Sequence, residues 1–247
     1  MIDLGTAKAG ERTSPEGKAI RNLILLATPK SEYAYLRPHL ELVPLPHHSS
    51  LHEPRQAPDH VYFPNSGLVS LVVVTRDGRS VETGVIGREG IAGLSSAFGF
   101  SRTSQRAVVQ VSGDAARIGV QWLLQALPLT PGLQMLLARF AVAQGVQAAQ
   151  TAACNRLHDV QQRLARWLLM SQDRLNSGFL PITHDFLATM LGTDRPSVSL
   201  AARDLQKKQV IDYSRGDLRV IDRKGLEGLS CECYSVLQQL NGEVGLT

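Results

Sequence analysis

Residues 180–205 read LPITHDFLATMLGTDRPSVSLAARDL, and this stretch decides the fold of the C-terminal part of the chain. Two apolar patterns of helical period flank a central Gly-Thr-Asp, and their members are Phe186, Leu187, Met190, Leu191, Val198, Ala201, Ala202 and Leu205. The first helix starts after Thr183 and ends at Gly192, since glycine enters the left-handed C-cap conformation at little cost. Asp194 can cap the second helix, and Pro196 falls in its first turn, where a missing N–H does no harm. The stretch therefore predicts a helix-turn-helix.

The second helix of this motif has a polar face that suits insertion into a DNA major groove. It presents Arg195, Ser199 and Arg203, and such hydrogen-bonding side chains read base edges. Downstream, Tyr213 and the run 218–221 flank Ser214-Arg215-Gly216-Asp217, which indicates a two-stranded wing with a basic tip. We expect one last helix after this wing, capped by Asp222 and including Leu226, Leu229 and Cys233.

The N-terminal half of the chain reads as a small β-barrel or jelly roll. Short runs rich in β-branched and apolar residues recur at 42–45, 60–64, 68–74, 80–86, 107–111 and 115–120. The sequence Arg76-Asp77-Gly78-Arg79 between two of these runs is a strong hairpin signal. Many short strands separated by turn residues favour a closed antiparallel barrel.

A long helical pattern follows the barrel and extends from Leu133 for over forty residues. Alanine and glycine make its first half, up to Ala153, unusually thin, and a break near 155–159 separates an amphipathic second half. A helix at the edge of a small barrel can rarely bury two faces within one chain, so we expect a homodimer across this helix. The expected dimerisation residues are Leu133, Leu137, Phe140, Gln144, Gln147, Ala148 and Thr151. The alternative is a helix packed wholly on its own barrel.

Barrel, long helix and winged helix, in that order, resemble the Crp/Fnr family of bacterial transcription regulators. The most specific matching stretches are Asp159–Leu169 and Leu191–Ser199. The resemblance implies an α+β fold with a cyclic-nucleotide-binding-type sensor barrel at 19–130, a dimerisation helix at 131–158 and a winged helix-turn-helix at 159–247. It also implies a homodimer on an inverted-repeat site in double-stranded DNA, with RNA polymerase as a further partner. Residues 1–18 are polar and are expected to form a disordered tail.

Only some of the residues with which members of this family contact DNA have counterparts in this sequence. Arg195 matches an arginine that meets a guanine or a phosphate, and Ser197 matches a hydroxyl that touches the backbone. Pro196 and Leu200 replace the base-reading glutamate and second arginine of several members, so a different operator is expected. We therefore expect Ser199 and Arg203 as further base readers, and the candidates for phosphate contacts are Lys207, Lys208 and Arg215.

The cassette that holds cyclic nucleotides in this family is altered here. Ile91, in the stretch Gly87–Leu94, stands where the family's ribose-binding glutamate belongs, and Ala148 and Ala149 stand where cAMP binders place hydroxyls. A buried polar group without a partner costs about 1–3 kcal/mol, so we expect cAMP binding to be lost. The candidate ligand residues are Gly90, Ile91, Arg106 and Ala107. Two alternatives remain for the control of this protein. The barrel could bind another nucleotide or small ligand, or the protein could be controlled by its abundance or by a protein partner without any ligand.

The cysteines and histidines do not predict a metal or haem site. Two cysteines, Cys231 and Cys233, cannot complete a tetrahedral zinc site, and Cys154 lies far away in sequence. The pair is interpreted as buried residues of the last helix, and a redox-active pair stays open. The histidines His47, His48, His52 and His60 lie among prolines and are expected at the surface.

Composition and the missing motifs indicate which classes of protein remain possible for this chain. The net charge of +4 is compatible with nucleic acid binding, and the chain has neither an apolar run that could span a membrane nor a signal peptide. Three cysteines in 247 residues favour a reducing compartment, so we expect a cytoplasmic protein. A serine elbow, a P-loop and paired catalytic carboxylates are all missing, so an enzyme is not expected. The alternative function is a sensor module that regulates a protein partner rather than DNA.

Overall fold

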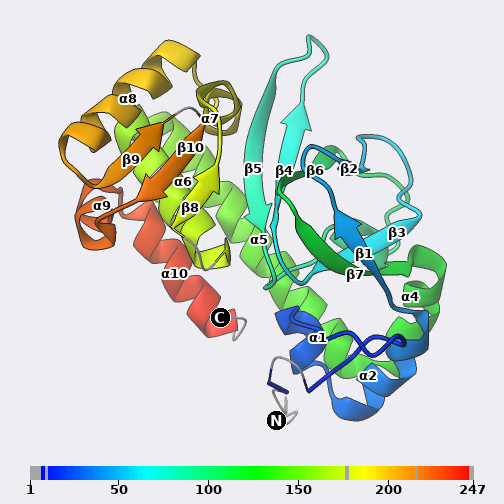
Figure 1. Ribbon diagram of the computed structural model, residues 1–247. Coiled ribbons are helices and arrows are strands. Elements are labelled where there is room, and N and C mark those ends of the chain that lie inside the picture. The colour runs from blue at the N-terminus through cyan, green and yellow to red at the C-terminus, as the bar shows by residue number, and fades with distance from the viewer. Residues whose placement is uncertain (1–6, 9–10, 176–177, 215, 245–247) are drawn as a thin grey trace.

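The computed structural model describes residues 7–8, 11–175, 178–214 and 216–244. An N-terminal β-barrel and a C-terminal winged helix lie side by side, and one long helix, α5, runs behind both (Figure 1). The helices are α1 Leu23–Ala27, α2 Lys30–Leu36, α3 Leu94–Ala97, α4 Val120–Ala126, α5 Pro131–Leu157, α6 Val160–Leu175, α7 His184–Leu191, α8 Arg195–Lys207, α9 Arg223–Leu229 and α10 Cys233–Val244, with short 3-10 turns at Arg37–His39 and Leu127–Leu129. The strands are β1 Glu41–Leu45, β2 Ser50–His52, β3 His60–Pro64, β4 Leu68–Val74, β5 Ser80–Ile86, β6 Gln105–Val111, β7 Gly113–Gly119, β8 Phe179–Pro181, β9 Ile211–Ser214 and β10 Asp217–Val220.

Two antiparallel sheets form the barrel, with strand orders β1-β7-β3 and β2-β6-β4-β5. The expected hairpin joins β4 to β5, where Thr75 N–H bonds to the carbonyl of Arg79 and Gly78 takes a φ of 84°. Strand β2 was not expected, because it has only three residues and a bulge interrupts its pairing with β6. A continuous apolar core fills the barrel and extends to helices α1, α2 and α5.

The segment 11–18 is folded, so the expectation of a disordered tail is wrong for this part of it. The buried Arg12 guanidinium donates to the carbonyls of Leu25 and Thr28, at the C-terminal end of α1. Arg37 donates from Nε to the carbonyl of Thr13 at 2.8 Å. Unpaired carbonyls at a helix end attract cations, and Arg12 satisfies two of them. Sequence polarity alone did not reveal this interaction.

Helix α5 buries the face that we expected to form the dimer. Leu133, Leu137, Phe140, Gln147 and Thr151 are buried within the chain itself, while Gln144 and Ala148 are half-buried. The dimerisation face expected from the sequence is therefore wrong, because the protein's own barrel and C-terminal domain cover it. A different stripe of the same helix is exposed or half-exposed and consists of Met135, Ala138, Val142, Gly145, Ala149, Ala152 and Arg156.

The C-terminal domain packs directly on the outer face of the barrel. Helix α6 and strand β5 are joined by a hydrogen bond from Trp167 Nε1 to Glu82 Oε1 at 2.8 Å. Arg174 of α6 pairs with Glu89 at 2.7 Å, and both side chains are largely buried. Leu68, Val72 and Val85 from the barrel share one apolar cluster with the winged helix. The barrel and the C-terminal domain therefore share part of their hydrophobic core.

The last helical segment is split in two, which corrects the expected single helix. Asp222 caps α9 as expected, accepting from Gly225 N–H at 3.0 Å, but Ser230 turns extended and ends it. Cys231 precedes α10 and Cys233 starts it. This break turns both thiols toward Cys154 and His158 at the end of α5. Cys154 is distant from Cys231 and Cys233 in sequence but close to them in space. The expectation that the cysteines could not form a four-ligand cluster, which was based on their sequence separation, is therefore wrong.

Within the residues that the structure describes, no single helix has the length and apolar character needed to cross a membrane. One bent pair, Val120–Leu129 with Pro131–Leu157, meets those criteria jointly, but its two parts are inclined by 114°.

Candidate nucleic-acid interface

Helices α7 and α8 form the predicted helix-turn-helix, and side-chain caps fix both starts. Thr183 Oγ1 accepts from Phe186 N–H at 3.2 Å, and Asp194 Oδ1 accepts from Ser197 N–H at 2.8 Å. Gly192 between them takes the left-handed conformation, with a φ of 58°. A side chain at Gly192 would be strained, and its Cβ would come within 3.0 Å of Val81 in the barrel. The turn is thus shaped both by its own backbone and by its contact with β5.

The solvent-facing side of α8 carries the residues expected to meet DNA. The Arg195 side chain is 64% exposed, and Arg203, Lys207 and Lys208 are exposed as well. Leu200 is 54% exposed, so an apolar side chain occupies the middle of this face. An exposed leucine on a recognition helix can contact a thymine methyl group but cannot accept or donate a hydrogen bond.

Ser199 points toward α7 rather than into solvent. Its hydroxyl lies 2.9 Å from His184 Nδ1, and the His184 ring stacks on Tyr213 with centroids 4.1 Å apart. Burial lowers the pKa of His184, and the nearby Arg195 adds to the effect, so the ring is held neutral near pH 7. Ser199 and His184 therefore connect α8, α7 and the wing. This contact does not support the expected role of Ser199 as a base reader and instead makes Ser199 a residue that positions α8.

Ser197 is also engaged locally, because its hydroxyl donates to Asp194 Oδ2 at 2.9 Å. Its oxygen can still accept a hydrogen bond, but a phosphate oxygen is itself an acceptor. To touch the DNA backbone as expected, Ser197 would have to release Asp194. Its position at the first turn of α8 remains compatible with a phosphate contact through the helix N-terminus.

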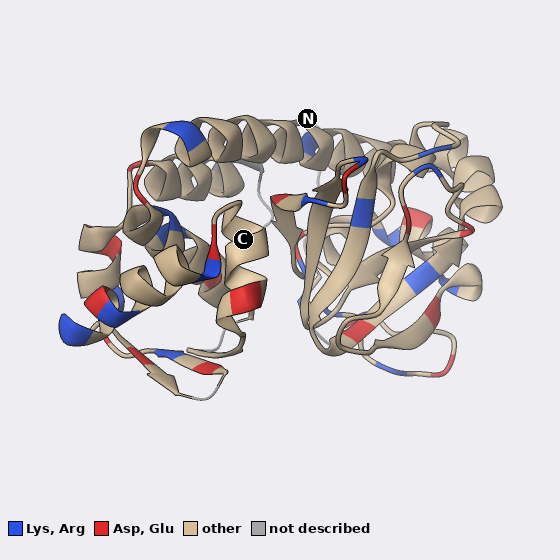
Figure 2. Cartoon of the chain, turned by 90° about the horizontal axis from the view of Figure 1, so that it is seen from above, with Lys and Arg blue, Asp and Glu red and all other residues tan. Residues whose placement is uncertain are grey.

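Acidic residues accompany the basic ones on this surface. Arg195 Nε lies 3.5 Å from Asp185 Oδ1, and Lys207 Nζ lies 3.8 Å from Asp204 Oδ1. Figure 2 shows charges of both signs on the winged helix, which occupies the left end of the molecule in this view. Exposed pairs of this kind contribute little and are readily exchanged for a phosphate partner. Arg215 lies outside the described residues.

The wing contributes a basic residue that the sequence reasoning missed. Arg219 on β10 is exposed, and its guanidinium carbon lies 5.9 Å from the centre of the Phe179 ring on β8. The alternation of 217–220, with Leu218 buried and Arg219 exposed, was the signal that could have found it. His184 had no comparable signal, because nothing in the sequence placed it beside Ser199.

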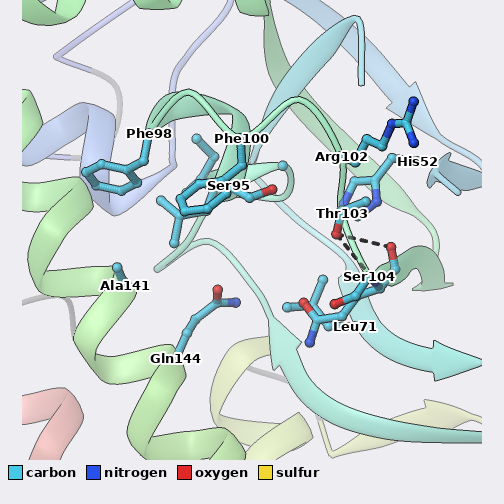
Figure 3. Close-up of a pocket in the computed structure, with 14 residues that line it drawn as sticks. His52, Leu71, Ser95, Phe98, Phe100, Arg102, Thr103, Ser104, Ala141 and Gln144 are labelled. Carbon is cyan, nitrogen blue, oxygen red and sulfur yellow. Dashed lines mark hydrogen bonds between the residues drawn. The ribbon is translucent and has the colours of Figure 1, made fainter. Parts of the chain in front are cut away.

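The barrel contains a pocket of about 400 Å³ between α3, the strand edge and α5. Figure 3 shows Ala141 and Gln144 of α5 on one side of it and His52 and Thr103 on the other. Its lining residues are His52, Leu71, Ile91, Gly93, Leu94, Ser95, Phe98, Phe100, Arg102, Thr103, Ser104, Gln105, Ala141 and Gln144. Ligand pockets commonly have volumes of roughly 300–1,000 Å³, so this space is large enough for a small molecule.

Only one of the four expected ligand residues lines this pocket. Ile91 does so, whereas Ala107 is buried in the core and Arg106 Nε pairs with Glu53 at 2.8 Å. Gly90 has a packing role, because a Cβ there would lie 2.2 Å from the Phe140 ring of α5. Arg102 and Gln105 line the pocket instead, and the sequence analysis did not identify them because no motif marks the loop before β6.

Two polar groups at the pocket wall have unused hydrogen-bonding capacity. Among the described residues, His52 Nδ1 and Gln144 Nε2 are buried and have no hydrogen-bond partner. His52 is therefore not the surface histidine that we expected, and burial lowers the pKa of its imidazole. A buried polar atom without a partner is costly, so both groups favour a polar ligand or water in the pocket.

A β-barrel with a pocket beside α5, a long helix and a capped helix-turn-helix with a wing form the architecture of a DNA-binding transcription regulator. Residues 42–127 match the cyclic nucleotide-binding domain, and residues 162–229 match the Crp-like helix-turn-helix domain. The chain belongs to the Crp/Fnr family of transcriptional regulators.

Solved structures share this architecture at low sequence identity. FixK2 from Bradyrhizobium japonicum is 16% identical, with a TM-score of 0.67 over 78% of this chain and 98% of that chain. The c-di-GMP-responsive regulator CLP from Xanthomonas campestris is also 16% identical, with a TM-score of 0.65 over 78% and 99%. A Crp/Fnr regulator from Eubacterium rectale is 15% identical, with a TM-score of 0.63 over 81% and 94%. At such identities the likeness shows the fold alone. No curated protein sequence matches this chain at a significant level.

Proposed function

We propose that this protein is a sequence-specific regulator that binds an inverted-repeat DNA site as a homodimer. The observation that carries the proposal is the exposed face of α8, where Arg195 and Arg203 face solvent on a helix capped at Asp194. Arginine at the start of a recognition helix can form two hydrogen bonds to a guanine. Lys207 and Lys208 at the other end would neutralise phosphates and fix the register of the helix on DNA.

The exposed stripe of α5, defined above from Met135 to Arg156, is the dimer face that we now propose. Its members follow one another at alternating intervals of three and four residues, which is the spacing of a coiled-coil seam. Val142 is 64% exposed at its centre, with Gly145 and Ala149 on the next two turns. Small residues permit close approach of two helices, and this apolar face has no cover within the described chain.

A two-fold dimer would place two copies of α8 on one side of the DNA. Successive major grooves on one face of DNA lie about 34 Å apart, so the operator should contain two half-sites separated by one helical turn. Its DNA target places the protein in the cytoplasm, and RNA polymerase is the partner through which it would act on transcription.

The pocket favours control of DNA binding by a small ligand rather than control without a ligand. It is lined by Gln144 and Ala141, which belong to the helix that we propose as the dimer interface. A ligand that contacts Gln144 could therefore bias the dimer arrangement through α5. The lining contains one arginine, Arg102, and no carboxylate, which suits an anionic or neutral polar ligand better than a cation. CLP, the similar protein from Xanthomonas campestris, responds to c-di-GMP, so cyclic dinucleotides belong among the ligands to test.

Selection of bound fragments from genomic DNA, followed by gel shift and footprinting, tests the proposal. We expect a footprint with two symmetric half-sites and an affinity that falls steeply with salt, because phosphate contacts release counterions. Asymmetric protection by a monomer would contradict the homodimer. If neither the free protein nor protein treated with cyclic mononucleotides and dinucleotides prefers any fragment, the sensor module acting on a protein partner becomes the better interpretation.

A further inference from the structure

Four metal-ligating side chains meet where α5 ends and α10 begins. Cys154 lies in the last turn of α5 and His158 directly follows this helix, while Cys231 lies between α9 and α10 and Cys233 starts α10. Their ligand atoms all lie within 4.8 Å of one another. Cys154 Sγ is 3.5 Å from Cys231 Sγ, and Cys233 Sγ is 3.6 Å from His158 Nδ1.

The Cys154–Cys231 and Cys233–His158 distances are close to the edges of a tetrahedron around a single zinc ion. With Zn–S bonds of about 2.3 Å and Zn–N bonds of about 2.0–2.1 Å, tetrahedral geometry gives S···S edges of about 3.8 Å and S···N edges of about 3.6 Å. The sulfurs of Cys154 and Cys231 are too far apart for a disulfide, whose bond is about 2.05 Å long. An iron–sulfur cluster needs several iron and sulfide atoms between its ligands, which this compact arrangement does not accommodate.

Neighbouring side chains hold the ligands as the outer shell of a metal site would. His158 Nε2 lies 3.2 Å from Glu232 Oε1, where a hydrogen bond to the carboxylate would place the ring proton on Nε2 and leave the lone pair of Nδ1 for a metal ion. Gln150 donates from Nε2 to Cys233 Sγ at 3.1 Å. A histidine ligand whose second nitrogen donates to a carboxylate is the common pattern in zinc sites, because it fixes the tautomer and the ring orientation.

Buried positive charge around the cluster also favours an anionic site. Arg163 and Arg166 on α6 are 7% and 3% exposed, and each interacts electrostatically with Cys154. Among the described residues, the Nε of each has no hydrogen-bond partner. Asp159 adds one negative charge near Arg163. Buried arginines are unfavourable without anionic partners, and three thiolates around one divalent cation leave a net negative charge close to both guanidinium groups.

We propose that Cys154, His158, Cys231 and Cys233 bind a single Zn²⁺ ion in each chain. On binding, each thiol releases its proton to solvent, and the ion joins three thiolates and the neutral imidazole. The site has four protein ligands and no open position, so its role is structural. It ties the C-terminal helices of the DNA-binding domain to the end of α5, independently of whether DNA is bound.

Metal analysis of the full-length protein, purified anaerobically with reductant, tests the proposal. We expect about one zinc per chain, and we expect chelation to expose all three thiols to alkylation. Replacing the zinc with Co²⁺ should give the visible absorption of a tetrahedral, thiolate-rich site. Protein that takes up no metal when titrated with Zn²⁺, or that forms a Cys154–Cys231 disulfide in its place, would overturn the proposal.

Variants separate this site from adventitious metal binding. Cys231→Ser should lose zinc, and Glu232→Gln should weaken zinc binding about 10–100-fold while leaving all four ligands in place. His47→Ala, at an exposed histidine of the barrel, is the matched control and should bind zinc as the parent does. Because Cys231→Ser could unfold, Glu232→Gln carries the test: an unchanged zinc affinity in both variants would contradict the assigned ligand set.

Discussion

Trp167 of α6 donates its indole N–H to Glu82 of β5 across 2.8 Å, and this bond joins the DNA-binding domain to the sensor barrel. The second carboxylate oxygen of Glu82 accepts from the Ser70 hydroxyl on the neighbouring strand β4. Burial raises the pKa of Glu82 to about 7, against its ordinary value of 4.5, although both hydrogen bonds oppose the shift. The contact between the two domains thus contains a carboxyl group that titrates near neutral pH.

Stability should fall as the pH rises through this range. A carboxyl whose pKa is raised in the folded state binds its proton more tightly there, so its stabilising effect is complete below about pH 4.5 and is lost as the pH passes about 7. The loss is on the order of 3 kcal/mol by linkage. Glu82→Gln keeps an acceptor for Trp167 and cannot titrate. We expect urea unfolding of this variant to show a flatter pH profile between pH 4.5 and 7.5 than the parent, and parallel profiles would contradict the assignment.

Removing the donor should cost more when Glu82 is charged. Trp167→Phe keeps an aromatic ring near Phe186, although a smaller one, and leaves one carboxylate oxygen without its partner. A lost buried hydrogen bond costs about 1–3 kcal/mol, and more for a charged group. We therefore expect a larger loss of unfolding free energy at pH 8 than at pH 5, measured by denaturant titration. The double variant with Glu82→Gln should remove this pH difference, and its persistence would mean that another group is responsible.

Arg195 and Lys207 should differ in what they contribute to DNA binding. Arg195→Ala should weaken binding to the selected operator by about 1–3 kcal/mol and relax the preference at one base position in each half-site. Lys207→Ala should weaken all sequences alike and lower the slope of the salt dependence by about one. Quantitative gel shifts over a series of salt concentrations distinguish the two. Lys30→Ala, at an exposed lysine of α2, is the control. Equal effects of Arg195→Ala on all sequences would contradict base reading.

Val142 lies at the centre of the proposed dimer face, so a charge there should separate the subunits. Val142→Glu would place two carboxylates across the two-fold axis in an apolar seam, where burial of unpaired charge is strongly unfavourable. We expect a monomer by light scattering and a loss of operator binding, with the fold of each chain retained. Gln121→Glu adds the same charge at an exposed position of α4, and we expect this variant protein to remain dimeric. A Val142→Glu protein that stays dimeric would move the interface elsewhere.

Ser199→Ala tests whether this hydroxyl positions α8 or reads a base. Because Ser199 is engaged with His184, we expect a loss of about 1 kcal/mol in stability and a uniform decrease in affinity across operator variants. A change in the preferred sequence would instead restore Ser199 as a base reader. Binding measured against a panel of single-base operator variants separates these outcomes.

Local patterns predicted most strands of the barrel and the helix-turn-helix, whereas the short elements α3, α4, β2 and β8 were not expected. The expected runs at 60–64, 68–74 and 80–86 coincide with β3, β4 and β5, because alternation and turn residues act over a few positions. The caps at Thr183, Asp194 and Asp222 were found for the same reason. Each of these features depends on neighbours in sequence.

Errors arose where the outcome depended on distant contacts. The periodicity of α5 revealed an apolar stripe but could not tell whether the stripe meets the barrel or a second chain, and Leu137 and Phe140 proved to face inward. Ser199 was assigned to DNA because no sequence pattern placed His184 beside it. Cys154 and Cys231 are brought together only by the break before α10.

Helix α5 is a continuous rod of 27 residues, which corresponds to a length of about 40 Å. Gln144, near the middle of α5, lines the barrel pocket. Val142 faces outward on the same turn, and His158 follows directly after the last residue of the helix. The helix has no proline and no break in its interior, so it has no kink at which a local rotation would be absorbed. In the proposed dimer, a turn of Gln144 about the helix axis would therefore change the angle between the two subunits and displace His158, where the DNA-binding domain is attached.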